Sequence, residues 1–384
     1  LIFFWKRLNR NQGIMYRKTT PVGFLSGKGT GSALNAVRSS PMQVLGFPCP
    51  PVILPAIFVI ALSAFSAPVS AEGNPGESFI VMTFNTGTGA SPCGDAEDNL
   101  GYGREQAHLS DKYYGNGLAW KPAVVAVGDF VREISPDIVA FQEMFSCEDC
   151  AAIPEEARAG FVCEDWRPGS PSVAQLVLGE DYQIAAHPGN ADKCLAVHKR
   201  FGRIRGCESR FALGGLEGHR IEDCGGGARV ARAVVERNDG GLITVISCHG
   251  TSGFSGHDRE CRKQQVDQIF VDFGDGAPAV NGGANLILGD LNTDPKRLPS
   301  IDRSARRWRE FVGGDNLFQF ITDRGMCAPG AYLGLFHIDH IVSDAFQGEV
   351  LYPGKNPEIA PAFSFQMFDH KPIIARMTPH PPKK

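Results

Sequence analysis

Asn285-Leu-Ile-Leu-Gly-Asp-Leu-Asn292 is a short apolar run that ends in a glycine and two polar side chains. An apolar run of four to eight residues that stops at a turn residue predicts a buried β-strand. Asp290 and Asn292 lie at the end of that strand, where a polar side chain can be held rigidly while it faces solvent or a substrate. The stretch therefore predicts a buried strand with candidate functional side chains at its end.

Further strands and two helices are predicted on both sides of this stretch. Apolar, β-branched or aromatic runs cover 79–84, 137–141, 194–198, 336–343 and 371–377, and a hairpin joins 230–235 to 242–247 across the Asn-Asp-Gly-Gly turn at 238–241. Helical spacing of apolar residues covers 124–134, which Ser135-Pro136 ends, and 259–273. The sequence has no internal repeat and no long linker, so it predicts one mixed α/β domain with many strands.

Acidic, amide and imidazole side chains recur at or beside the ends of these predicted strands. Glu143 follows 137–141, His249 follows 242–247, Asp339 lies within 336–343, and Asp369 and His370 precede 371–377. Carboxylate and amide oxygens are the ligands that Mg²⁺ and Mn²⁺ prefer, and neutral imidazoles suit acid–base work or charge stabilisation at a phosphoryl group. The sequence has no dinucleotide fingerprint, no P-loop and no G-x-S-x-G elbow.

Six motifs stand in a fixed order: Phe79 to Asn85, Phe141-Gln-Glu143, Ser247-Cys-His249, Gly289-Asp-Leu-Asn292, Ile338-Asp-His340 and Asp369-His-Lys-Pro372. Each motif alone is weak, but the ordered set, over residues 79–377, resembles the endonuclease/exonuclease/phosphatase superfamily, which includes deoxyribonucleases and neutral sphingomyelinases. The resemblance implies an α/β fold of the α+β type, a four-layer α/β/β/α sandwich with two packed mixed β-sheets and the site at one edge. One departure is Phe368, since the family usually has serine before Asp-His.

The resemblance also implies a divalent metal, Mg²⁺ or Mn²⁺. Glu143 would be its principal ligand, and Asn85 beside it would help to hold it. Asp369 would lie close enough to a metal to be a ligand. Whether one metal or two act stays open at this point. Three further histidines lie near these motifs in the sequence and are given no role in the site: His257, His337 and His340.

The remaining matched side chains would carry the reaction. Asp290 and Asn292 would position the attacking water and bind the phosphate, and Asp290 is a candidate base. His370, held by Asp339, would lie against the scissile phosphate, and His249 would donate to a phosphate oxygen or assist the leaving group. These roles are implied by the resemblance, and the identity of the base stays open.

A leader precedes the predicted domain. Residues 1–71 carry seven basic side chains and no acidic one, and within them 52–66 is an uncharged, mostly apolar run of 15 residues followed by the small-residue end Ala67-Pro-Val-Ser-Ala71. This order predicts a secretory signal peptide at about 42–71, and hence a secreted or periplasmic protein. A retained membrane anchor is the alternative, although a span needs about 20 apolar residues.

Residues 72–384 are predicted to form the catalytic domain. They keep 31 of the 38 basic side chains and all 42 acidic ones, which gives a net charge of about −11. This excess of negative charge does not favour non-specific binding of a polyanion. A bound metal and local basic groups can still supply positive charge at the site.

Ten of the eleven cysteines lie in this domain, and the other is Cys49. An even number of cysteines in an exported chain predicts up to five disulfides. Cys147-x-x-Cys150 has the spacing of half a zinc site, but no second close pair completes it, so a structural disulfide is favoured. The Cys-rich segment 146–228 is interpreted as an insertion that shapes access to the site.

Several functions remain open. The leading hypothesis is a secreted phosphodiesterase or nuclease, which predicts a positive groove formed by arginines. The alternatives are a sphingomyelinase-type lipid phosphodiesterase with Tyr332-Leu-Gly-Leu-Phe336 as its apolar finger, a phosphomonoesterase of inositol phosphates or nucleotides, and a binding module on the same fold. We predict a monomer whose partner is a phosphoester substrate, either nucleic acid or a phospholipid head group, with no protein partner. The arginines in question are Arg203, Arg205, Arg210, Arg220 and Arg229.

Overall fold

The computed structural model describes residues 78–89, 99–323, 330–354, 358–359 and 361–380. The predicted signal peptide, Cys93 and Cys327 lie outside these ranges. None of the helices within them is both long and apolar enough to cross a membrane.

Two β-sheets of seven strands each form the centre of the protein, as the resemblance implied. The strands of the first sheet, in spatial order, are β13 (Phe346–Tyr352), β14 (Ile373–Pro379), β1 (Phe79–Asn85), β2 (Ile138–Gln142), β4 (Asn190–His198), β3 (Tyr182–His187) and β6 (Phe211–Ala212). The second sheet runs β11 (Gln319–Phe320), β12 (Asp339–Ser343), β10 (Asn285–Asp290), β9 (Leu242–His249), β8 (Val230–Arg237) and β5 (Gly202–Ile204), and β7 (Glu217–Gly218) pairs with β8.

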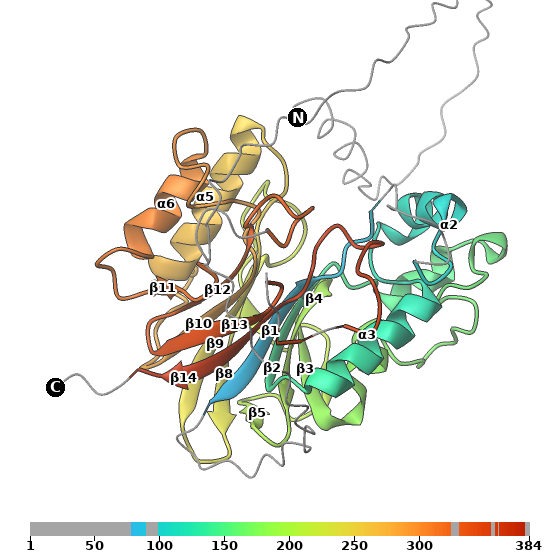
Figure 1. Ribbon diagram of the computed structural model, residues 1–384, viewed down its shortest axis with the longest axis horizontal. Coiled ribbons are helices and arrows are strands. Elements are labelled where there is room, and N and C mark those ends of the chain that lie inside the picture. Colours follow the sequence, from blue (N-terminus) through green and yellow to red (C-terminus); the bar gives the residue numbers. More distant parts are fainter. Residues whose placement is uncertain (1–77, 90–98, 324–329, 355–357, 360, 381–384) are drawn as a thin grey trace, which may run out of the picture. The chain divides into compact units, whose positions relative to one another are not determined.

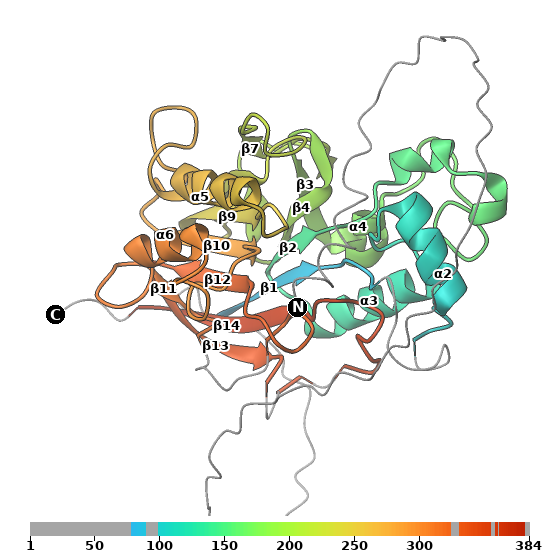
Figure 2. The same cartoon turned by 90° about the horizontal axis from the view of Figure 1, so that it is seen from above.

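Helices cover the outer faces of both sheets, so the described residues form four layers (Figures 1 and 2). α5 (Gly256–Phe270) and α6 (Arg303–Phe311) lie over the second sheet. α3 (Lys121–Ile134) and α4 (Val173–Leu178) lie over the first, with α2 (Arg104–Leu109) and the π-helical turn Ser110–Tyr114 beyond α3. Short 3-10 turns are Cys147–Ala152, Glu155–Ala157 and Gly179–Asp181.

Local sequence signals explain where two of these helices begin and end. α5 starts in a reciprocal capping box, because the Asp258 amide donates to Ser255 Oγ at 3.0 Å and the Ser255 amide donates to Asp258 Oδ2 at 2.8 Å. α3 carries Pro122 in its first turn and ends at Ser135, whose left-handed φ of 48° stops the helix before Pro136.

Three apolar clusters fill the spaces between the layers. The central cluster lies between the sheets and takes Val81 and Ile138 from one and Leu286 and Leu288 from the other. Met82 and Phe84, which alternate with Val81 along β1, face the helices of the first sheet instead. Since both faces of each central strand are buried, these strands are near-continuous apolar runs, which is why the sequence marks them clearly.

Elements with mixed patterns are the ones that the sequence analysis missed. β3, β13, α4 and α6 were not predicted, and the strands expected at 336–343 and 371–377 begin only at Asp339 and Ile373. β13 is an edge strand whose middle residues Gln347 to Glu349 are exposed, so its pattern carries little apolar signal. Segment 146–228 supplies β3, β4 and β6 to one sheet and β5 and β7 to the other.

Two disulfides form among the described cysteines, Cys150–Cys163 and Cys224–Cys261. The expectation of up to five was too high, because four described cysteines are free thiols. Cys150 does form a structural disulfide, but its partner is Cys163, and Cys147 of the same C-x-x-C motif stays reduced. The free thiols are Cys147, Cys194, Cys207 and Cys248.

His187 ties the two sheets together and makes stability depend on pH. Its Nε2 lies 2.9 Å from Ser247 Oγ and its Nδ1 lies 3.1 Å from the Ala228 carbonyl. Burial, and next the nearby positive charge of Lys193, lowers the pKa of His187 to about 3. Between pH 6.5 and 3 the unfolded chain binds a proton that the folded protein does not, so stability falls as the pH falls.

We expect the free energy of unfolding to drop by about 2 kcal/mol between pH 7 and pH 5 because of this one group. Urea denaturation at both pH values should show that loss in the wild-type protein and a loss smaller by that amount in His187→Gln. Equal losses in the two proteins would show that His187 does not stay neutral in the folded state.

Candidate active site

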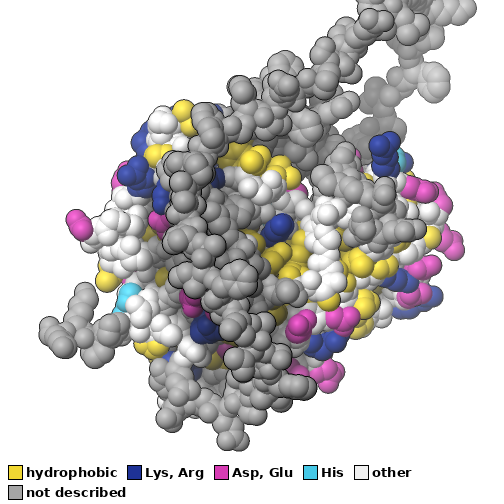
Figure 3. All heavy atoms as spheres, in the orientation of Figure 1, with side chains coloured by type: hydrophobic (Ala, Val, Ile, Leu, Met, Phe, Trp, Pro, Cys, Tyr) yellow, Lys and Arg dark blue, Asp and Glu magenta, His cyan; other side chains and the backbone are white. Residues whose placement is uncertain are grey.

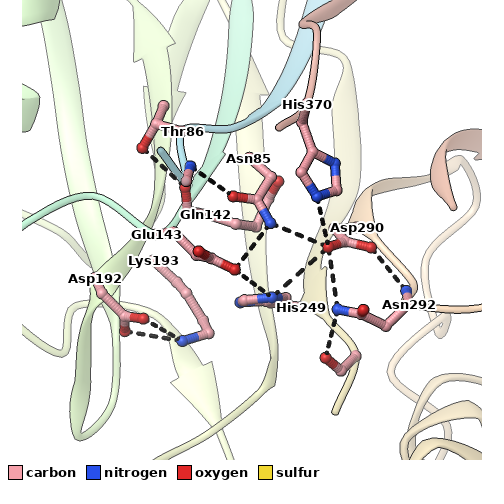
Figure 4. A network of polar contacts seen from close by, with 12 residues as sticks. Asn85, Thr86, Gln142, Glu143, Asp192, Lys193, His249, Asp290, Asn292 and His370 are labelled. Atoms are coloured by element: carbon pink, nitrogen blue, oxygen red, sulfur yellow. Dashed lines mark hydrogen bonds and ion pairs between the residues drawn. The ribbon is translucent and has the colours of Figure 1, made fainter. Parts of the chain in front are cut away.

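The strand register brings the predicted site residues to one edge of the sandwich. β1 and β2 are parallel, with Asn85 opposite Gln142, so Asn85 and Glu143 leave the first sheet at the same end. In the second sheet, Asp290 lies opposite His249 on the parallel neighbour β9 and opposite Asp339 on the antiparallel neighbour β12. Figure 4 shows the resulting network, in which side chains from both sheets point toward one another.

Asp290 is the centre of this network. Its Oδ1 accepts from the Asn292 amide at 2.7 Å, and its Oδ2 accepts from Asn292 Nδ2 and Asn85 Nδ2, both at 3.0 Å. Burial, and next the negative charge of Asp339, raises the pKa of Asp290 to about 7. A carboxyl group with this pKa can both hold and release a proton near neutral pH.

His370 and Asp339 form a hydrogen-bonded pair beside Asp290. His370 Nδ1 lies 2.8 Å from Asp339 Oδ2, and His370 Nε2 lies 3.7 Å from Asp290 Oδ2. Burial alone would lower the pKa of His370, but the charges of Asp339 and Asp369 outweigh it and raise that pKa well above the ordinary value. The imidazole is therefore a cation whose orientation Asp339 fixes.

His249 lies on the other side of Asp290 and is buried without any hydrogen bond to its ring nitrogens among the described residues. Its Nε2 is 3.4 Å from Glu143 Oε1 and 3.7 Å from Asp290 Oδ2. Burial, and next the positive charges of Lys193 and Arg229, lower the pKa of His249 well below the ordinary value. A neutral imidazole with unused nitrogens can bind a substrate oxygen.

Three oxygens converge on Gly87, just after β1. A Cβ atom at residue 87 would meet Glu143 Oε2 at 2.6 Å, Asp369 Oδ1 at 3.1 Å and Asn85 Oδ1 at 3.2 Å. Asp369 Oδ1 is buried and has no hydrogen-bond partner among the described residues. Two carboxylates and one amide are the hard oxygen ligands that Mg²⁺ or Mn²⁺ requires, so the side chains present fit such an ion.

A second group of side chains could also hold a metal. Asp290, Asp339 and His370 offer ligand atoms that all lie within 4.8 Å of one another. In this structure, however, His370 Nδ1 and Asp339 Oδ2 are joined by their own hydrogen bond. The oxygens around Gly87 are therefore the better candidate metal site, and Asp339 and His370 are a hydrogen-bonded pair.

At two site residues the backbone has an uncommon conformation, which determines the direction of the side chain. Glu143 has a φ of 59° and Asn292 a φ of 49°, a left-handed conformation that is uncommon for residues other than glycine. Glu143 directly follows β2, and Asn292 lies two residues after the end of β10. Such strain persists where surrounding structure holds it and clusters at functional sites.

The structure thus brings together all eight side chains predicted for the site, and it adds others that the sequence did not indicate. Gly87 was interpreted only as part of a turn. Lys193 is a buried cation that donates to both oxygens of Asp192, at 2.6 and 2.8 Å, beside Glu143 and His249 (Figure 4). A lysine next to an aspartate on an apolar strand is the only sequence signal that pointed to it. Tyr332, which the sequence indicated only as part of an apolar finger, is the third addition, because its ring centroid lies 4.6 Å from that of His370.

The predicted arginine groove is wrong for at least two of its five members. Arg229 lies at the site, since its Nη1 approaches the His249 and Gly250 carbonyls at 3.4 Å. Arg203 and Arg205 belong to the β5 region, which pairs with the opposite end of β8, about 20 Å along the strand. The sequence placed all five arginines in one segment, but β8 carries the chain away from the site.

No protein-family model and no curated protein matches the sequence. Similar solved structures include an endonuclease/exonuclease/phosphatase from Beutenbergia cavernae (14% identity, 79% of this chain and 72% of that chain covered, TM-score 0.46). Others are an endonuclease/exonuclease/phosphatase family protein from Bacteroides thetaiotaomicron (12%, 78% and 94%, 0.42) and an AP endonuclease from Archaeoglobus fulgidus (14%, 77% and 98%, 0.40). The likeness to these structures is one of fold.

A metal ion at the Gly87 site is expected to stabilise the fold. At about 100 times its dissociation constant, Mg²⁺ or Mn²⁺ should raise the melting temperature by about 5 °C, because it binds only the folded protein. Glu143→Gln should lose this shift, whereas Glu133→Gln, the same change on the exposed side of α3, should keep it. Differential scanning fluorimetry measures the melting temperature. An equal metal-induced rise in both variants would show that the ion binds elsewhere.

Proposed function

We propose that this protein is a divalent-metal-dependent phosphoesterase that hydrolyses phosphodiester bonds by in-line attack of water. The observation that carries the proposal is the position of Asp290. It lies between the oxygens that fit a metal, from Asn85 and Glu143, and a cationic histidine held by a second aspartate. Metal-dependent hydrolysis of a phosphodiester uses all three: a metal, a base and a group that stabilises charge on the phosphoryl oxygens.

Each side chain has a task in that reaction. The attacking water loses its proton to Asp290, whose pKa of about 7 suits a general base at neutral pH. A new bond forms between the water oxygen and phosphorus while the bond to the leaving oxygen breaks. The His370 cation faces the negative charge that develops on the phosphoryl group, and His249 binds another of its oxygens. Asn85, Glu143 and Asp369 would hold a divalent metal, which would supply Lewis-acid stabilisation of the same charge.

The substrate we favour is a nucleic acid or another soluble diester. Arg229 lies next to His249 and can contact a phosphate beside the scissile one. On the part of the face in Figure 3 that grey atoms do not cover, basic and acidic side chains are interspersed and form no continuous basic stripe.

A lipid phosphodiester is the second candidate. Leu333 and Leu335 are each 59% exposed on the loop that leads to the site, and the Leu333 amide donates to the Asp369 carbonyl at 2.9 Å. Exposed leucines at the rim of a catalytic site suit a substrate presented at a membrane surface. A phosphomonoesterase is the remaining alternative.

We also propose that the protein is exported. The apolar and small-residue pattern of residues 52–71 supports export, and so do the two disulfides, because disulfides persist in oxidising compartments.

A substrate panel tests the proposed function. The purified chain, with its disulfides formed, is offered plasmid DNA, RNA, sphingomyelin vesicles, a soluble phosphodiester and an inositol phosphate, each with Mg²⁺ and with EDTA. Metal-dependent cleavage of a diester is expected, and the preferred diester separates the nucleic-acid from the lipid reading. Cleavage of the monoester alone would contradict the diesterase assignment.

A further inference from the structure

Tyr332 is held directly on the proposed catalytic histidine. The Leu333 amide donates to the Asp369 carbonyl and the Lys371 amide donates to the Ala331 carbonyl, so Tyr332 and His370 form an antiparallel pair with the hydrogen bonds on either side of it. In such a pair the two Cα atoms approach to about 4.5 Å and the side chains lie on the same face. The ring centroids of Tyr332 and His370 are accordingly 4.6 Å apart.

The hydroxyl of Tyr332 is unused. Tyr332 is only 8% exposed, and its hydroxyl makes no hydrogen bond to any described residue, yet it is not among the buried polar atoms that lack a partner. The hydroxyl is therefore open to a ligand although the ring is buried. Burial, and next the negative charges of Asp369, Asp290 and Glu143, raise the pKa of Tyr332, so the group stays a protonated donor at any working pH. The ring contact with His370 places Tyr332 at the site.

We propose that Tyr332 contacts the substrate, with its hydroxyl donating to a non-bridging oxygen of the scissile phosphate while its ring fixes the imidazole of His370. The inference rests on the proposed phosphoesterase function and assigns a role to a residue outside the six motifs. A neutral donor suits a place lined by carboxylates, because it adds a contact to the phosphate without pairing with those carboxylates as a lysine or arginine would.

Two substitutions separate the two parts of this role. Tyr332→Phe removes the hydroxyl and keeps the ring, so kcat/KM for a soluble phosphodiester should fall about 10-fold to 100-fold with no change in melting temperature. Tyr332→Leu also removes the ring and should lower kcat further and shift the NMR signals of the His370 imidazole, which Tyr332→Phe leaves in place. Tyr352→Phe is the matched control, because Tyr352 is also 8% exposed but lies on β13 among Phe130 and Phe365.

Binding of inorganic phosphate in the presence of Mg²⁺, measured by calorimetry, separates failure of this inference from failure of the function. Weaker binding to Tyr332→Phe than to the wild-type protein and Tyr352→Phe supports the contact. Equal phosphate binding and equal kcat/KM in all three would overturn it while leaving the phosphoesterase intact. A wild-type protein that neither binds phosphate nor cleaves any phosphoester would overturn both.

Discussion

Asp290→Asn is expected to reduce phosphodiester hydrolysis by about 10³-fold or more, because it removes the general base. Both carboxylate oxygens of Asp290 accept hydrogen bonds, from the Asn292 amide on one side and from two side-chain amides on the other. An asparagine can accept on one side only and turns its own N–H₂ toward donors on the other. The variant therefore loses the base and also disturbs Asn85 and Asn292.

Folding must be checked separately from turnover in this experiment. Burial disfavours the charged form of Asp290, so a neutral side chain avoids that cost. This gain offsets part of the stability lost with the hydrogen bonds. We therefore expect Asp290→Asn to stay folded, with a melting temperature close to that of the wild-type protein. Asp315→Asn, the same change on an exposed turn, is the control and should keep full activity. An active Asp290→Asn would rule out the assigned base.

Arg262→Met is expected to destabilise the fold by about 3 to 5 kcal/mol, because it leaves a buried charge without its partner. Arg262 lies on α5 and is almost fully buried. Its guanidinium donates to Asp302 Oδ2 at 2.9 Å and to the carbonyls of Thr251 and Gly253 at 2.7 Å. Asp302 Oδ2 in turn accepts from Thr293 Oγ1 at 3.1 Å. This one side chain therefore ties the loop after His249 to the segment after Asn292.

Urea denaturation measures this effect, and activity gives a second readout. Arg309→Met, on the exposed side of α6, is the matched control and should change stability by less than about 0.5 kcal/mol. Because the two loops follow the site residues His249 and Asn292, folded Arg262→Met should also show a lower kcat. A loss of stability equal to that of the control would mean that the Arg262–Asp302 pair is not needed to hold the loops.

The sequence predicts the strand ends of the site well for a physical reason. Strands such as 285–290 are buried on both faces, so their apolar runs stand out, and a polar residue at the end of such a run needs a function or a partner. What the sequence does not give is the pairing. Only the register shows that Asp290 lies opposite both His249 and Asp339.

The residues that were missed act through space rather than through a pattern. Gly87 matters because a Cβ there would fill the space among three oxygens, and Tyr332 because a two-residue bridge places it on His370. Neither relation can be recognised from the composition of the sequence or from the spacing of its residues. The arginine groove failed for the complementary reason, since proximity in sequence to Arg229 does not keep Arg203 at the same end of β8.

Hydrolysis of bis(p-nitrophenyl) phosphate by the purified chain tests metal-dependent diester hydrolysis at this site most directly. Release of p-nitrophenolate is followed with Mn²⁺ or Mg²⁺, after addition of EDTA, and after the metal is restored, beside Asp290→Asn. We predict hydrolysis that EDTA abolishes, that excess metal restores, and that the variant lacks. Hydrolysis that persists in EDTA, or a folded wild-type protein that binds the metal and cleaves no diester, would contradict the assignment.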